Sequence, residues 1–119
     1  MYAEIRAARP DAMLVFPDSL TLIRRAEIAE YAARERIPTM YGWTEFVEAG
    51  GLVSYGPGLT ENWKVLATFV DKILKGADAN TLPIEQVKRI GLTINMKAAK
   101  LIGLAIPQAI LARADRVIE

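Results

Sequence analysis

The feature that most constrains the fold of this chain is a short apolar run that leads through a tight turn into a helical pattern. Residues 12–16 read AMLVF without a polar side chain, which is typical of a parallel strand covered on both faces. Pro17 ends the run, and Asp18 stands where its side chain can cap a helix. Apolar residues then recur at spacings of three and four as far as Arg36. The stretch predicts a strand, a turn and a helix.

The same order of elements recurs further along the chain. Residues 39–41 and 52–55 predict two more strands, with a short helix at 44–49 between them. Residues 59–75 carry an apolar stripe at helical spacing, and Gly76 follows as a left-handed stop. Alternating strands and helices favour a parallel sheet. We therefore predict an α/β fold with a three-layer parallel sheet in one domain, because 119 residues suffice to bury a single core.

The last third of the chain has a different pattern. Residues 76–86 form a polar connection, and residues 90–95 then alternate between apolar and small or polar side chains. This alternation predicts a half-buried strand, which suits an edge or a two-sided environment. A short helix at 97–102 follows, and Pro107 stands where it can open a terminal helix.

Composition excludes several classes of function. The chain has no Cys and no His, which excludes thiol nucleophiles, imidazole bases and nearly every zinc site. No acid pair or Ser-Lys arrangement replaces them, so we expect no catalytic activity, no metal and no cofactor. The 15 basic and 14 acidic residues are dispersed, which argues against a nucleic-acid partner. No apolar run approaches the roughly 20 residues of a membrane span, and the N-terminus lacks the apolar core of a signal peptide.

The candidate ligand site lies where the first three predicted strands end. The carboxyl ends of parallel strands meet at one edge of a sheet, where α/β proteins bind ligands. The residues that we assign to a ligand-binding site there are Asp18, Ser19, Tyr41, Gly42, Trp43, Glu45, Ser54, Tyr55 and Gly56. A carboxylate among them can bind an ammonium group, hydroxyl or backbone N–H groups can bind a carboxylate, and the rings can cover apolar atoms. The glycines lack the spacing of a nucleotide-binding loop.

Each of these residues also has a purely structural interpretation. Asp18 and Ser19 are adequately explained as helix caps, and Glu45 stands where a helix dipole favours negative charge. Tyr41 follows apolar strand residues and can point into the core. Trp43 follows a turn glycine, and for it we favour contact with a ligand or another lobe; Tyr55 is similar. Three further aromatic side chains are expected to be packing residues: Phe16, Trp63 and Phe69.

The sequence resembles the C-terminal part of a family of bacterial ABC-transporter substrate-binding proteins. The resemblance lies in DAMLVFPDSL, in IPTMYGWTEFVEAGGLVSYGP, in VDKILKGADANTLPIEQ and in the closing LTINMKAAKLIGLAIPQAILARADRVIE. These segments cover essentially the whole chain in order. The resemblance implies one lobe of a type I periplasmic-binding-protein fold, in which two lobes close around a small ligand and the closed form docks on a permease. Some relatives are receptors for tryptophan or other aromatic amino acids.

From this resemblance we expect a solute-binding component of an ABC importer. The chain would contribute half of a cleft for a small ligand, such as an amino acid, and one surface that docks on the permease. An N-terminal lobe would be missing, residues 1–87 would form the C-terminal lobe, and residues 88–119 would be a hinge or inter-lobe segment. Periplasmic or extracytoplasmic localisation is implied, with the signal peptide belonging to the missing part. The alternative is a cytoplasmic α/β regulatory or effector-binding domain of a signalling protein or transcription regulator.

A chain without its partner lobe is also expected to self-associate. Apolar faces on Ile94, Ala98, Leu101 and Ile102 would lack a partner, and large exposed apolar patches favour association. We predict a homodimer, or exchange of the segment from about residue 88 onward between two copies.

Overall fold

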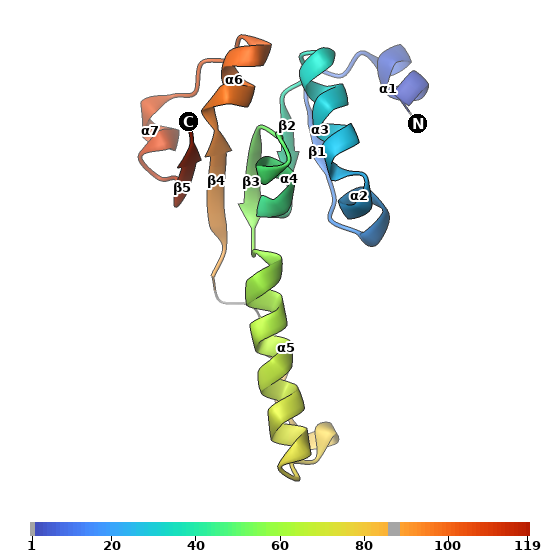
Figure 1. The fold of residues 1–119 in the computed structure, drawn as a ribbon, viewed down its shortest axis with the longest axis vertical. Coiled ribbons are helices and arrows are strands. Elements are labelled where there is room, and N and C mark those ends of the chain that lie inside the picture. The colour runs from blue at the N-terminus through green and yellow to red at the C-terminus, as the bar shows by residue number, and fades with distance from the viewer. Residues whose placement is uncertain (1, 86–88) are drawn as a thin grey trace.

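A computed structural model of the chain describes residues 2–85 and 89–119, and these form a mixed α/β structure around one sheet (Figure 1). The strands are β1 (Met13–Val15), β2 (Thr39–Tyr41), β3 (Val53–Gly56), β4 (Gly91–Asn95) and β5 (Arg116–Ile118). The helices are α1 (Tyr2–Ala8), α2 (Ser19–Ile23), α3 (Arg25–Arg34), α4 (Thr44–Glu48), α5 (Leu59–Leu74), α6 (Met96–Ile102) and α7 (Gln108–Leu111), with a 3₁₀ turn, η1, at Ala79–Thr81. The predicted α/β fold class is confirmed.

The sheet has the order β1-β2-β3-β4-β5 and is mixed. β1, β2 and β3 are parallel, as predicted, but β4 runs antiparallel to β3 and parallel to β5. The prediction of a parallel sheet was therefore wrong for the pair β3 and β4. The reason is visible in Figure 1: the chain leaves the sheet at the end of β3, makes α5, and re-enters from the same side, so β4 must run back. β4 is also an inner strand, because β5 pairs with its other edge. β5 was not predicted from the sequence.

The core lies between the sheet and the helices on one of its faces. Ile28 of α3 packs with Tyr41 of β2 and with Phe46 and Val47 of α4. A second, smaller cluster joins Leu52 to two alanines of α6. Alanine at these α6 positions is what allows the helix to approach so closely, since a short side chain leaves room for the neighbouring backbone. Helices α3, α4 and α6 therefore form the well-packed layer.

The opposite face of the sheet is covered only in part. Residues 104–110, which lead into and through α7, lie against Met40, Val53 and Ile94 and leave an apolar cavity of about 270 Å³. Leu14 and Tyr55 lie outside this cover and are 59% and 54% exposed. The third layer of the predicted arrangement is thus thinner than the first.

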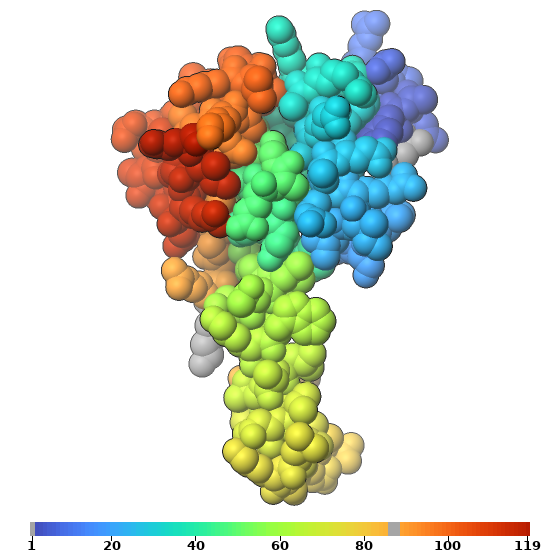
Figure 2. All heavy atoms as spheres, in the orientation of Figure 1, coloured from blue at the N-terminus to red at the C-terminus, as the bar shows by residue number. Residues whose placement is uncertain are grey.

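Helix α5 lies away from the sheet. Figure 2 shows it as a narrow arm below the body of the molecule, and it has no buried residue. Its apolar stripe is open to solvent, with Trp63 63% and Leu66 50% exposed. The helix is where the sequence predicted it, but packing of Trp63 was a wrong expectation, as it was for Phe16, which is 72% exposed. Phe69 is partly covered, with the Lys72 Nζ 5.4 Å from its ring centroid.

The segment after residue 88 is better packed than expected. Ile94 is 1% exposed and Ala98 is 5% exposed, both covered by the same chain, so the expectation that these two lack a partner is wrong. Leu101 is 71% exposed, and Ile102 packs at the edge of the smaller core cluster. Exposed apolar side chains gather on α5 instead, where Trp63, Leu66, Val70, Ile73 and Leu74 are each 45% or more exposed.

Candidate functional site

The carboxyl ends of β1, β2 and β3 meet in close backbone contact. A Cβ on Gly42 would lie 2.8 Å from two ring carbons of Pro17, and a Cβ on Gly56 would overlap the carbonyl oxygen of Gly42. Neither glycine has a positive φ. Their requirement is therefore close approach of neighbouring chain segments, and not the turn conformation that the sequence suggested. The three strand ends form one continuous edge.

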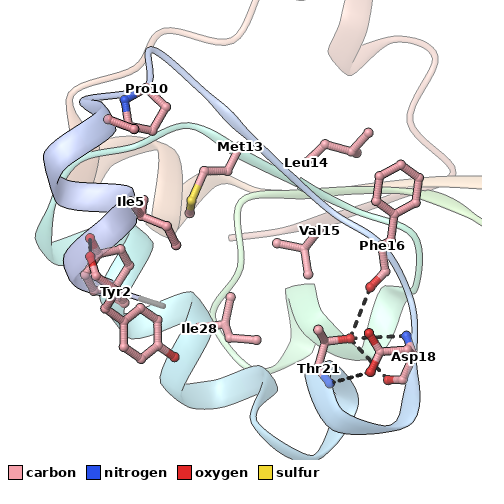
Figure 3. A pocket seen from close by; sticks show the side chains of 12 residues that line it. Tyr2, Ile5, Pro10, Met13, Leu14, Val15, Phe16, Asp18, Thr21 and Ile28 are labelled. Atoms are coloured by element: carbon pink, nitrogen blue, oxygen red, sulfur yellow. Dashed lines mark hydrogen bonds between the residues drawn. The ribbon is translucent and has the colours of Figure 1, made fainter.

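The first part of the edge is a capped helix start (Figure 3). Asp18 Oδ1 accepts hydrogen bonds from the backbone N–H groups of Leu20 at 2.7 Å and Thr21 at 3.0 Å. Thr21 Oγ1 in turn accepts from the Asp18 N–H at 3.2 Å, which completes a capping box. Ser19 is the first residue of α2 and is exposed. The cap predicted for Asp18 is confirmed, while one oxygen of its carboxylate makes neither of these bonds.

Two of the nine predicted residues lie in the core. Tyr41 is fully buried, and its ring stacks on Phe46 with centroids 5.0 Å apart. Burial raises the pKa of the Tyr41 hydroxyl to about 12, and this hydroxyl has no hydrogen-bond partner. Ser54 is also fully buried, and its Oγ has no partner. Tyr41 and Ser54 are paired in the register of β2 and β3, so their side chains lie on the same face of the sheet. This is the face that α3 and α4 cover.

Trp43 and Glu45 connect this edge to the elements on either side. Trp43 is partly buried against the core cluster of α3 and α4. Glu45 Oε1 accepts a hydrogen bond from the backbone N–H of Leu59, the first residue of α5, at 3.1 Å. Gly58 precedes Leu59 as the N-cap and has no side chain to supply that acceptor. Glu45 Oε2 is buried without a partner. The carboxylate thus fixes the start of α5 to α4.

Tyr55 lies on the other face of the sheet from Tyr41 and Ser54. It is the largest exposed side chain among the nine predicted residues, at 54%. The other five residues with side chains stand at the strand ends or in the helices that follow them, and these are Asp18, Ser19, Trp43, Glu45 and Tyr55. The sequence did not indicate the contact to Leu59, because the residue that Glu45 reaches lies in another element.

A separate apolar groove lies beside β1 and was not predicted from the sequence. It has a volume of about 510 Å³ and is bounded by α1, β1 and α3 (Figure 3). Asp18 and Thr21 stand at one end of it, and Pro10 at the other. Among residues 2–85 and 89–119 there is no group of His, Cys, Asp and Glu that could hold a metal ion. Over the same residues, no helix is both long and apolar enough for a transmembrane segment.

Comparison with known proteins finds one matching family model and several similar solved structures. The family model described as "ABC transporter substrate binding protein" matches residues 6–118. A conserved domain protein from Vibrio cholerae has a similar structure, with a TM-score of 0.85 and 26% identity over 98% of this chain and 41% of that chain. No curated protein is similar enough in sequence to count as a relative.

Two further solved structures share the fold. One is an ABC domain in complex with L-Trp from Streptococcus pneumonia, with a TM-score of 0.85 and 24% identity over 96% of this chain and 39% of that chain. The other is the ligand-free, open structure of CD0873 from Clostridium difficile, a substrate binding protein with adhesive properties, with a TM-score of 0.64 and 19% identity over 98% and 40% of the two chains. The chain thus spans about two fifths of the length of each of these three structures.

Proposed function

The chain belongs to the family of ABC transporter substrate binding proteins, and we propose that it forms part of the solute receptor of an ABC importer. In this proposal the edge at the ends of β1, β2 and β3 is one wall of a cleft for a small ligand. The opposite wall belongs to an N-terminal lobe outside these 119 residues. Proteins of this family are in general not enzymes, and the proposal assigns no catalytic residue.

The observation that carries the proposal is the direction in which α5 leaves the sheet. The helix departs from the carboxyl end of β3. It has no buried residue, and the side chains of its apolar stripe are largely open to solvent, with Trp63 63% and Leu66 50% exposed. A helix with one apolar face gains most of its stability when another element packs on that face. We assign the cover to the N-terminal lobe, which would then stand opposite the edge that carries the predicted ligand residues.

The ligand class follows from the chemistry of that edge. Asp18 retains a carboxylate oxygen outside its capping bonds, and it can bind an ammonium group. Tyr55 and Trp43 offer ring faces to an apolar side chain. An amino acid with a large side chain satisfies both features. The roles proposed for all nine residues remain predictions, and the two buried ones, Tyr41 and Ser54, would act by shaping the edge from beneath.

Transport follows from closure of the two lobes. A ligand that contacts both walls binds the closed form more tightly than the open one and shifts the population toward it. In this proposal the permease binds the closed form of the receptor. The receptor would therefore act in the periplasm or another extracytoplasmic space. The proposed boundary between a lobe at 1–87 and a hinge or inter-lobe segment at 88–119 falls outside the described residues.

Calorimetric titration of this chain with amino acids, including L-Trp, tests the two-lobe mechanism. One wall alone lacks half of the contacts, so we expect no heat that fits a dissociation constant tighter than about 1 mM, which corresponds to about −4 kcal/mol. Micromolar affinity in this chain would contradict a shared cleft. Titration with Tyr55→Ala serves as the control for any weak binding, which should be lost in that variant.

A further inference from the structure

The apolar groove beside β1 runs along an unpaired edge of the sheet. β1 pairs with β2 on one side only. The Met13 N–H donates to the carbonyl of Pro38 at 2.9 Å, so the alternation of a strand directs the N–H and C=O groups of Leu14 to the free edge. The groove beside them is lined by apolar side chains of α1, β1 and α3, among them Ile5, Val15 and Ile28 (Figure 3).

Apart from its short length of three residues, this edge lacks the features that protect a free strand from pairing. Residues 13–15 carry no charge, no proline and no bulge, whereas exposed edges in natural proteins are usually blocked by such features. Leu14 and Phe16 are 59% and 72% exposed. A strand with open hydrogen-bonding groups and uncovered apolar side chains is the expected state of an inner strand whose neighbour is absent.

The hand of the strand–helix–strand connections indicates which part of the chain would supply the strand next to β1. α3 links β1 to β2 and α4 links β2 to β3, and both helices pack on the same face of the sheet. Strand–helix–strand connections are right-handed in nearly all proteins. A helix on this face therefore carries the chain in one direction only, from β1 toward β3.

α1 lies on that same face, next to α3 and beyond β1 (Figure 1). The rings of Tyr2 and Tyr31 are 4.4 Å apart, and the Tyr31 hydroxyl donates to the carbonyl of Tyr2 at 3.1 Å. Arg6 and Glu35 form an ion pair at 2.7 Å. Because α1 feeds β1 from this face, a right-handed connection requires the strand before α1 to lie on the side of β1 away from β2.

We infer that the free edge of β1 takes a further strand, parallel to β1 and supplied by polypeptide that precedes α1 in the full-length protein. Its apolar side chains fill the groove between α1, β1 and α3. The inference rests on the proposed function in one respect, namely that this chain is part of a longer receptor, for which the two-fifths coverage of similar structures leaves room. It adds that the lobe itself, and not only the receptor, extends beyond these residues.

Two extended chains test the inference. In one, a six-residue strand of Val, Ile and Thr and a short polar loop precede Tyr2. In the control, two of the six residues are Pro, which cannot donate to a ladder. We expect the strand-forming extension to slow exchange of the Leu14 amide on the order of tenfold or more relative to the Pro control, since a paired amide exchanges only when its pairing opens. The thermal midpoint should rise with it.

Equal exchange of the Leu14 amide in two folded, monomeric extended chains would overturn the inference. Concentration-dependent protection of Leu14 in the chain without an extension would also overturn it, because a second copy would then be the occupant. Neither readout involves ligand, so failure here leaves the proposed cleft untouched, and failure of the amino-acid titration leaves the strand untouched.

Discussion

Adding a single methyl group at Gly56 should lower the stability of the fold substantially. A methyl group there would meet the backbone carbonyl of Gly42, which cannot move without displacing β2. We expect Gly56→Ala to lower the free energy of unfolding by about 1–3 kcal/mol, the usual range for overpacking. Gly91 is opposite Gly56 in the ladder, and a Cβ there would lie 3.8 Å from Asp115 Oδ2, an ordinary contact. Urea denaturation should show Gly91→Ala within about 0.5 kcal/mol of the parent; equal losses would contradict the close approach.

Glu45 should control the start of α5 through its bond to the Leu59 N–H. Glu45→Ala removes the acceptor, at an expected loss of about 0.5–2 kcal/mol, as for other lost N-caps. Glu45→Gln keeps an acceptor oxygen and should retain most of this stability. Amide exchange in the first turn of α5 distinguishes the two variants. If both variants protect that turn equally, Glu45 does not hold the helix.

Because the Tyr41 hydroxyl is buried, we expect the free energy of unfolding to depend on pH in the alkaline range. Its hydroxyl has a pKa of about 12 in the fold and of about 10 in an unfolded chain. Above pH 10 the unfolded state loses this proton first, so the contribution of Tyr41 is complete below pH 10 and is lost as pH rises toward 12. A shift of this size corresponds to about 3 kcal/mol at most. Tyr41→Phe should flatten that part of the stability profile, because the variant has no hydroxyl to lose a proton at this position. An unchanged slope in Tyr41→Phe would contradict the burial.

At the scale of elements, α5 should be separable from the core in its contribution to stability. Val70 is 49% exposed on the α5 stripe, whereas Ile28 is 6% exposed under the sheet. Ile28→Ala should cost about 2–5 kcal/mol because it leaves a cavity. Val70→Ala should be neutral or slightly stabilising, since alanine is the better helix former. Denaturation midpoints measure both changes, and a large loss for Val70→Ala would mean that α5 folds back onto the body.

The sequence predicted the elements better than their partners. Apolar runs located β1, β2 and β3, and the stripe of Leu59 to Lys75 located α5 almost to its ends. A stripe shows that a helix needs an apolar neighbour but does not say which segment provides it, so Trp63 was expected in a core that this chain does not supply. β5 escaped prediction because three residues, one of them Arg116, carry too little periodicity.

For the candidate site, the sequence predicted where the strand ends lie but not which way each side chain points. The rule that parallel strands end together located the edge, because it depends only on topology. Which side of a strand a residue faces depends on register, and for that reason Tyr41 and Ser54 proved to be core residues. The bond from Glu45 to Leu59 depends on tertiary placement that no local pattern encodes.

The whole molecule is less compact than a complete domain of its length. Its radius of gyration is 17.3 Å, against about 13.5 Å for a compact chain of this size. Its accessible surface is 8231 Å², against about 6,400 Å² for a compact monomer. The difference exceeds the roughly 800 Å² that each partner buries in a standard interface. The molecule thus exposes more surface than a compact monomer of its length, as we expect if further polypeptide covers part of it.

Small-angle scattering tests this shape in solution. A monomer with α5 extended should give a radius of gyration near the 17.3 Å of the structure, and a dimer through the α5 stripe should double the scattering mass. Leu66→Lys on α5 should restore the monomer in the second case, and Lys64→Leu, beside it, should not. A monomer near 13.5 Å would show that α5 packs on its own body and needs no other lobe.

The central proposal is that the edge at the ends of β1, β2 and β3 is one wall of the ligand cleft. The direct measurement is a two-dimensional NMR titration of the isotope-labelled chain with millimolar L-Trp and, in parallel, with glycine. We expect small shifts that grow with L-Trp concentration at Asp18, Trp43, Glu45 and Tyr55, none at Leu74 on the far end of α5, and weaker shifts with glycine. Shifts confined to the groove beside β1 or to the α5 stripe, with the edge unchanged, would contradict it.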